Sequence, residues 1–336
     1  MAVGFEGSAG NLRGFPEIKS VSFFVNNMCN LRCPYCYLSG INSEAPVEIN
    51  ADETLGFIKK IHEYSRLENV SIVGREPTLS PKTTFAMLNG LREMNIPKIG
   101  IITNGTLITK KYAKKLAELV SFVDVSVDGL QDVHEATRGK GNFAKTISGI
   151  RYLLDAGADV FVLHKVDGAS APQLSEFAQF LRNDVEVKNL HMFPLYPNEI
   201  DISVFMGAIE KLVSDPPPAM LISVKADYFD GGIFPSLTNY VRQDVKKISM
   251  ERITFVEKAI GNGSALRIML EAEPAEFDRG LRIDHLGRLV FCADQARGLN
   301  RPVGNILEDP SEIFSRIELI KKIRAEYMEH TTIAQL

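Results

Sequence analysis

Several absences limit what this sequence can encode. No apolar run approaches the roughly 18 residues of a bilayer-spanning helix, and tryptophan is absent. Basic residues are not in excess, since 38 Lys and Arg stand against 42 Asp and Glu, a net charge of −4. Binding to nucleic acid through its phosphates is therefore disfavoured. Residues 1–19 lack the apolar stretch behind a basic start that is typical of a signal peptide. We expect a cytoplasmic protein without a membrane or nucleic-acid partner.

The composition that remains is that of an ordinary globular protein. The chain has 336 residues, of which 45% are hydrophobic, so disorder, collagen and coiled coil are excluded. From residue 20 onward, short apolar runs alternate with segments of helical periodicity. The expected strands are residues 20–25, 70–73, 99–103, 122–127, 159–166 and 188–193. Such alternation predicts βαβ crossovers in an α/β fold, and six units predict a partial (β/α)6 TIM-like barrel.

The pattern changes after residue 200. Residues 214–219 include three consecutive prolines, which favour a boundary there. Beyond it we expect a strand near residues 221–228, a helix at 246–260, a hairpin strand just before Cys292 and a helix at 310–327. The predicted organisation is a lead-in at residues 1–19, a partial barrel at 20–213 and a small C-terminal α+β extension at 214–336 that covers the substrate.

Cysteine is scarce, and its distribution is uneven. Cys29, Cys33 and Cys36 form a C-x3-C-x2-C loop, whereas Cys292 stands alone near the other end. Three thiolates on one loop can ligate three corners of an iron–sulfur cube and leave one iron open. Zinc is the alternative, but structural zinc sites use paired C-x2-C units or histidines. None of the six histidines lies within 25 residues of the loop, so the spacing favours a cluster.

The cysteine loop, directly after the first strand, resembles the signature of the radical S-adenosylmethionine (radical SAM) superfamily. In that family the open iron binds the methionine part of the cofactor, and one electron releases a 5′-deoxyadenosyl radical. Residues 73–77 resemble the family's Gly-Gly-Glu-Pro stretch, with Arg75 in place of the second glycine. Residues 101–105 and 126–129 resemble the segments that end its third and fourth strands. The resemblance implies one 4Fe–4S cluster and S-adenosylmethionine as cofactors, with a flavodoxin- or ferredoxin-like one-electron donor as partner.

The resemblance also implies roles for individual residues. Cys29, Cys33 and Cys36 would hold the cluster. Glu76 would contact the methionine amino group, and Ser126 and Arg138 the carboxylate. The full set of implied cofactor-binding residues is Tyr35, Gly74, Glu76, Asn104, Ser126 and Arg138. Structural alternatives stay open, because Asn104 and Asp128 begin Asn-Gly and Asp-Gly turn pairs and Arg138 could be a surface charge.

The segment around Cys292 resembles the extensions called SPASM and twitch, which bind auxiliary clusters through several further cysteines. A single cysteine cannot do so, and we therefore expect one cluster. Cys292 could be a buried small side chain, or it could donate a hydrogen atom to a substrate radical. The second reading resembles radical epimerases of aminoglycoside sugars, the neomycin epimerase type of antibiotic biosynthesis.

A cluster of carboxylates just before Cys292 bears on the substrate. Its members are Glu271, Glu273, Glu276, Asp278 and Asp284. They could line a pocket for a polycationic small molecule, or form a solvated acidic face. Lys165, Asp167 and Tyr196 follow the fifth and sixth strands and are expected to face the same cavity without an assigned role.

The expected function is epimerisation of a carbon in a small sugar-containing metabolite, with Cys292 as hydrogen-atom donor. The first alternative is another radical reaction: modification of a ribosomal peptide, or a dehydrogenation or deoxygenation that needs no thiol. The second is a zinc-stabilised binding module or a non-catalytic electron carrier, in which Cys292 could be the fourth cluster ligand.

Overall fold

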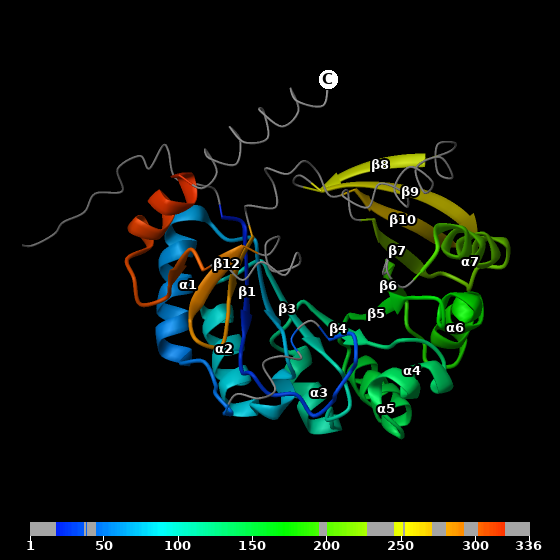
Figure 1. The fold of residues 1–336 in the computed structure, drawn as a ribbon, viewed down its shortest axis with the longest axis horizontal. Helices are drawn as coiled ribbons and strands as arrows, with labels where there is room; N and C mark the ends of the chain where they lie inside the picture. Colours follow the sequence, from blue (N-terminus) through cyan, green and yellow to red (C-terminus); the bar gives the residue numbers. More distant parts are fainter. Residues whose placement is uncertain are drawn as a thin grey trace, which may run out of the picture.

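The structure, a computed structural model, describes residues 18–36, 38, 45–194, 200–226, 245–250, 253–270, 280–291 and 302–319. Its described strands form one curved sheet in the order β13-β12-β11-β1-β2-β3-β4-β5-β6-β7-β10-β9-β8 (Figure 1). The central strands, β1 to β7, follow sequence order, and each pairs in parallel with the next. They are β1 Ser20–Phe24, β2 Asn69–Val73, β3 Lys98–Thr103, β4 Phe122–Ser126, β5 Val160–Val166, β6 Asn189–Pro194 and β7 Leu221–Ala226.

Helices connect these strands and cover the convex face of the sheet (Figure 1). They are α1 Ala51–Ser65, α2 Pro81–Glu93, α3 Lys110–Ala117, α4 Gln131–Arg138, α5 Asn142–Asp155, α6 Leu174–Asn183 and α7 Ile202–Ser214. The first illustrates how the sequence builds them. The Asn50 side chain caps α1 by accepting from the amide of Glu53, and Phe57, Ile58 and Ile61 turn one face inward. Because the sheet is open and its strands parallel, the predicted partial barrel is confirmed.

The C-terminal strands extend both edges of the same sheet. At one edge, β10 (Ser264–Leu270) pairs in parallel with β7, and β9 (Ile253–Gly261) and β8 (Val245–Met250) continue antiparallel. At the other, β11 (Gly280–Ile283) pairs in parallel with β1, followed by β12 (Arg288–Phe291) and β13 (Gly304–Asn305). The sheet thus runs through the boundary expected at residue 214, and the division into three parts stays a prediction.

One predicted helix is wrong. Residues 246–260 form the β8–β9 hairpin, because this segment is rich in β-branched residues such as Ile253, Thr254 and Val256 and finds a pairing partner in β10. The terminal helix is present at residues 310–319; the rest of its expected length lies outside the described residues. Helix α4 and strand β11 had no sequence prediction.

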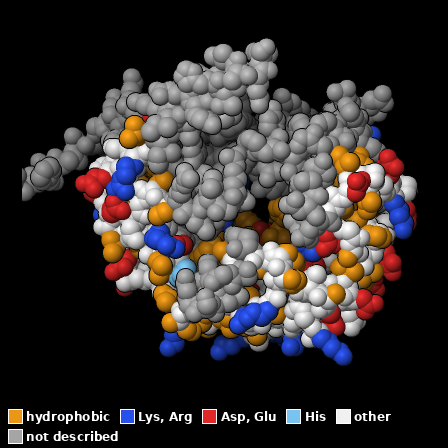
Figure 2. Space-filling model, in the orientation of Figure 1, with side chains coloured by type: hydrophobic (Ala, Val, Ile, Leu, Met, Phe, Trp, Pro, Cys, Tyr) orange, Lys and Arg blue, Asp and Glu red, His pale blue; other side chains and the backbone are white. Residues whose placement is uncertain are grey.

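The main hydrophobic core lies between the sheet and its helices, where Val21, Ile72 and Val123 from the strands meet Ile58 and Leu88 from the helices. None of the helices in the described part of the chain has the length and apolar character needed to cross a bilayer. Figure 2 shows a hollow near the middle of the face, bordered by hydrophobic and charged side chains. Polar segments gather at the carboxyl-terminal strand ends, as active sites do in parallel barrels.

Candidate functional site

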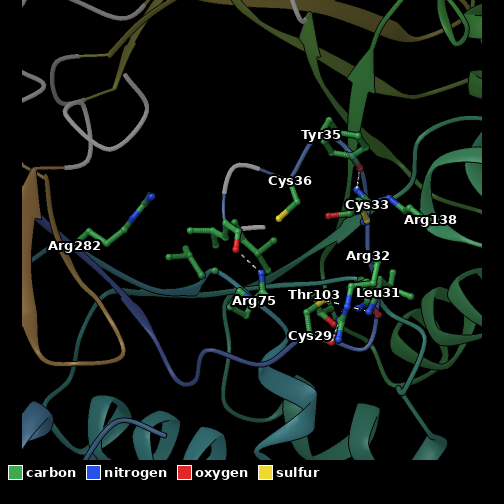
Figure 3. A pocket seen from close by; sticks show the side chains of 16 residues that line it. Cys29, Leu31, Arg32, Cys33, Tyr35, Cys36, Arg75, Thr103, Arg138 and Arg282 are labelled. Atoms are coloured by element: carbon green, nitrogen blue, oxygen red, sulfur yellow. Dashed lines mark hydrogen bonds between the residues drawn. The ribbon is translucent and has the colours of Figure 1, made fainter. Parts of the chain in front are cut away.

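A cavity of about 290 Å³ lies at the carboxyl-terminal ends of β1 to β4 (Figure 3). Nearly every site residue predicted within the described part of the chain lines it: Cys29, Cys33, Tyr35, Cys36, Gly74, Asn104, Ser126 and Arg138. They come from four segments distant in sequence. Parallel pairing places the ends of successive strands at one edge of the sheet, which is why these segments meet.

The cysteine loop follows β1 and presents its three thiols to this cavity. Cys29, Cys33 and Cys36 are half-buried and free of disulfides. The Cys36 amide donates to the Cys33 carbonyl at 3.1 Å, and the Leu31 amide donates to the Cys29 Sγ at 3.4 Å. Burial raises the pKa of the Cys29 and Cys33 thiols, so metal binding there must displace protons. Within the described residues, no three candidate ligands are placed to hold a single metal ion.

Glu76 follows β2 but is not part of the cavity lining, and its expected contact with the methionine amino group stays a prediction. Its side chain belongs to a residue only 1% exposed and is not part of the lining. Oε1 accepts from the hydroxyls of Thr78 and Thr103 at 2.6 and 2.7 Å, and Oε2 accepts from the backbone amide of Asn104 at 2.7 Å. Burial raises the Glu76 pKa, although these hydrogen bonds oppose the shift. The carboxylate therefore joins the ends of β2 and β3.

Arg138 reaches the cavity from the end of α4 and forms an ion pair with Asp128. Its Nε and Nη2 donate to the two Asp128 carboxylate oxygens at 2.9 and 3.1 Å. Tyr35 and Thr137 donate their hydroxyls to Asp128 Oδ2 at 2.6 and 2.8 Å. Burial alone would raise the pKa of Asp128, but the Arg138 charge and these hydrogen bonds outweigh it and lower the pKa. The pair leaves Nη1 of Arg138 as a donor without a hydrogen bond among the described residues.

Asp128 is not among the site residues expected from the sequence, but it contacts two of them, Tyr35 and Arg138. It begins an Asp-Gly pair directly after β4, which was open to a purely structural turn reading. In the structure its carboxylate joins Tyr35, next to Cys36, to Arg138 on α4. The available signal was the position of an acidic residue at a strand end, facing a later arginine.

Asn104 fastens the cysteine loop to the end of β3. Its side-chain Nδ2 donates to the Asn30 Oδ1 at 2.9 Å, while its Oδ1 accepts from the backbone amide of Thr106 at 3.0 Å. Asn30 in turn donates to the Thr106 hydroxyl at 2.9 Å. The Asn104 side chain thus fixes the position of the cysteine loop relative to β3. Ser126, by contrast, lines the cavity, and its hydroxyl forms no hydrogen bond with another described residue.

Lys165 and Asp167 lie beside Tyr35. The Lys165 ammonium is ion-paired with Asp167 and lies 4.4 Å from the centroid of the Tyr35 ring. Both residues are buried, so the pair and the ring contact together fix one face of the tyrosine. Tyr196 lies outside the described residues.

The acidic pocket expected for a polycation finds no support in the described residues. Cys292 and the four carboxylates of residues 271–278 lie outside them. Asp284 is a turn residue of the β11–β12 hairpin, where it accepts from the amides of Leu286 and Arg288 and pairs with the Arg288 guanidinium. In the described lining, no residue is acidic and four are arginines: Arg32, Arg75, Arg138 and Arg282.

The comparison with protein families decides the superfamily. The model of the radical SAM superfamily matches residues 24–181, the segment that holds the cysteine loop and the strand ends described above. The chain carries a radical SAM domain. Of the sequence interpretations, the superfamily is thereby confirmed, and the cofactors expected for the chain, a 4Fe–4S cluster and S-adenosylmethionine, are those of this family.

Individual relatives of the radical SAM domain support this at different levels. The probable GTP 3′,8-cyclase of Methanococcus maripaludis is 32% identical over 146 residues, which are 42% of this chain and 47% of that protein. SuiB of Streptococcus suis, bound to the precursor peptide SuiA, superposes with a TM-score of 0.63 at 15% identity, covering 88% of this chain and 64% of SuiB. The enzyme anSMEcpe with bound AdoMet gives a TM-score of 0.62 at 17% identity, covering 88% and 80%.

These likenesses support the fold and the domain, but not the reaction of the whole chain. At such low identities the two solved structures show a shared fold. The chain spans about half the length of the curated relatives it matches. The radical SAM assignment is therefore secure for the domain, and the reaction of the whole chain is a separate question.

The residues of the radical SAM domain fit the family's cofactors. Three thiols on one loop line a single cavity, and thiolates are the usual ligands of iron–sulfur clusters. Cys29, Cys33 and Cys36 would hold the cluster. The Ser126 hydroxyl and the Arg138 Nη1 border the same cavity and suit a carboxylate.

Gly74, in the cavity wall, tolerates no side chain. Its φ is +83°, and an added Cβ would lie 2.4 Å from the Phe24 ring. Gly74→Ala should lower the free energy of unfolding by about 2 kcal/mol, from left-handed strain and overpacking, measured by urea denaturation. The matched control is Gly56→Ala on α1, where an added Cβ meets no atom within 4 Å. This variant should raise the free energy of unfolding by up to about 1 kcal/mol. Equal effects of the two changes would contradict this account of Gly74.

Proposed function

We propose that this chain is a radical SAM enzyme that binds one 4Fe–4S cluster through Cys29, Cys33 and Cys36 and uses S-adenosylmethionine to abstract a hydrogen atom from a substrate. The observation that carries the proposal is the convergence of three thiols and three strand-end segments on one cavity within the matched radical SAM region. An electron carrier would need no such additional polar segments around its cluster.

Each part of the cavity has a task in this proposal. When bound, the cluster supplies the electron that cleaves S-adenosylmethionine to methionine and a 5′-deoxyadenosyl radical. The cysteine loop is held in place from β3 by Asn104. Ser126 and the Arg138 Nη1 orient the methionine carboxylate, and the Asp128 carboxylate keeps the Arg138 guanidinium in position. The electron comes from a flavodoxin- or ferredoxin-like partner.

The finer proposal is epimerisation with Cys292 as donor. The substrate carbon loses its hydrogen atom to the 5′-deoxyadenosyl radical, which becomes 5′-deoxyadenosine. The Cys292 thiol returns a hydrogen atom to the opposite face. The resulting thiyl radical takes one electron from the flavodoxin- or ferredoxin-like partner and one proton from solvent, which restores the thiol before the next turnover. The supporting feature is one cysteine outside the cluster loop in the whole sequence. The alternative is peptide modification. The solved structure of SuiB, which is similar in fold, has a precursor peptide bound, so peptides are included as substrates in the test below.

The test of the first level is anaerobic reconstitution followed by addition of S-adenosylmethionine. We expect a cluster electron paramagnetic resonance signal that changes on addition, and 5′-deoxyadenosine formation with a reductant. If the protein binds iron but neither response occurs, it is an electron carrier and the proposal is wrong. If it binds zinc and forms no cluster, the binding-module alternative holds.

The test of the second level replaces Cys292 by alanine and by serine. With a sugar-containing substrate in deuterated water, the wild-type enzyme should place solvent deuterium on the inverted carbon, because a thiol exchanges with solvent. Both variants should still form 5′-deoxyadenosine but lose at least about tenfold of the inverted product. Unchanged turnover of the variants, or activity on peptides without solvent label, would overturn the donor role.

A further inference from the structure

Arg75 reaches across the cysteine loop and holds both of its ends. Its Nε donates to the carbonyl of Asn27 at 3.2 Å, and its Nη1 donates to the carbonyl of Leu38 at 2.7 Å. Figure 3 shows Arg75 in the same cavity as the three cysteines. Asn27 precedes the first cluster cysteine and Leu38 follows the last. One side chain at the end of β2 thus spans the segment that carries all three thiols.

We propose that Arg75 is a positioning residue that closes the cysteine loop around the cluster; this rests on the proposed function. A guanidinium is planar, and its donors keep a fixed separation, so two bonds to the loop ends fix the distance between them. Donors that carry charge also form stronger hydrogen bonds than neutral ones. The loop cannot open without breaking at least one of these bonds.

The other contacts of the loop show why Arg75 matters at its far end. Near Cys29, the neighbouring Glu76 amide donates to the carbonyl of Met28 at 2.8 Å, and Asn104 holds Asn30. These bonds secure the first half of the loop. In the second half, the Tyr35 hydroxyl donates to Asp128 at 2.6 Å. Beyond Cys36, Leu38 packs with Phe24 and Val73, an apolar contact without direction. The Arg75 bond adds the directional restraint there.

The charge of Arg75 has a second effect. Its hydrogen bonds in the described residues go to backbone carbonyls, and no carboxylate among those residues forms an ion pair with it. The guanidinium lines the cavity with the three thiols. The potential of an iron–sulfur cluster depends on the net charge around it. A fixed positive charge favours the reduced, more negative cluster, so Arg75 should raise the cluster's reduction potential.

Two substitutions separate these effects. Arg75→Lys keeps the charge but has a single donor group and cannot hold both carbonyls. Arg75→Met keeps most of the length and removes both charge and donors. The control is Arg32→Met: Arg32 lines the same cavity but is exposed, and it donates to the carbonyls of Cys29 and Leu31 within the loop. It therefore bridges no loop ends.

The experiment measures how fast reconstituted protein loses iron to an excess of chelator, and the midpoint potential of the cluster by redox titration. Arg75→Met should lose iron at least about tenfold faster than wild type and have a lower potential. Arg75→Lys should also lose iron faster but keep a potential close to wild type. Arg32→Met should lose iron within about twofold of the wild-type rate.

Each outcome decides one claim. Wild-type rates of iron loss in both Arg75 variants would overturn the closing role while the cluster, and with it the proposed function, stands. Wild-type protein that assembles no cluster would remove both. Rapid iron loss from Arg32→Met equal to that of Arg75→Met would show that any cavity arginine suffices, and would also overturn the inference. Thermal unfolding of each variant before reconstitution confirms that the fold is intact.

Discussion

Replacing Cys33 by alanine is expected to reduce 5′-deoxyadenosine formation to below detection. Cys33 is one of three half-buried thiols that line the cavity, and two thiolates on this loop cannot hold three corners of a cluster. The measurement is 5′-deoxyadenosine per hour by chromatography after anaerobic reconstitution, together with iron and sulfide content. Both the product and the bound iron should fall together.

The control for the Cys33 variant separates loss of the cluster from loss of the fold. Lys114→Ala changes an exposed residue on α3 and should leave iron content and product at wild-type values. The urea midpoint of Cys33→Ala without metal should stay close to that of the wild-type apoprotein, since only a half-buried thiol is removed. Full activity of the Cys33 variant would refute the assignment of the cluster ligands.

Asp128→Ala is expected to cost about 3–5 kcal/mol of unfolding free energy, the largest stability effect that we predict. Asp128 is 0% exposed and compensates the nearly buried Arg138 guanidinium through two hydrogen bonds. Removing one partner of a buried pair leaves an uncompensated charge in a medium of low dielectric constant. Urea denaturation with linear extrapolation measures the change.

A double variant tests whether the loss comes from the stranded charge. Asp128→Ala combined with Arg138→Met should be more stable than Asp128→Ala alone, because the unpaired guanidinium is gone. Equal or greater loss in the double variant would contradict this explanation.

Acid adds an independent check on the same pair. The folded-state pKa of Asp128 is lowered, so its contribution is present above the unfolded value of about 3.9 and is lost as pH falls toward the folded value. Wild-type stability should therefore drop more steeply than that of Asp128→Ala in this acidic range.

The sequence predicted most of the central sheet and the cavity, for a physical reason. Apolar periodicity located each central strand of the barrel to within one or two residues, and parallel pairing then brings the strand ends together. Cys29, Gly74, Asn104 and Arg138 meet in one cavity because they follow strands or lie beside their ends. No knowledge of side-chain packing was needed for that step.

The misplaced or missed features depend on contacts that periodicity does not encode. The Glu76 carboxylate is not part of the cavity lining, because two threonine hydroxyls and two backbone amides satisfy it in the interior. Segment 246–260 becomes a hairpin because β10 offers a partner. Arg282 enters the cavity on β11, whose pairing with β1 no local pattern reveals.

The pairing of β1 with β11 has a consequence for how the protein is made. Arg282 Nε donates to the Ser22 hydroxyl at 3.0 Å across this strand pair, between residues 260 positions apart. At roughly 5–20 residues per second, a ribosome needs about 13 to 50 s to reach the second strand after completing the first. During that time the first strand of the barrel has an open edge able to pair with other chains. The nascent chain thus carries an aggregation hazard at β1, which it loses only after β11 has been synthesised.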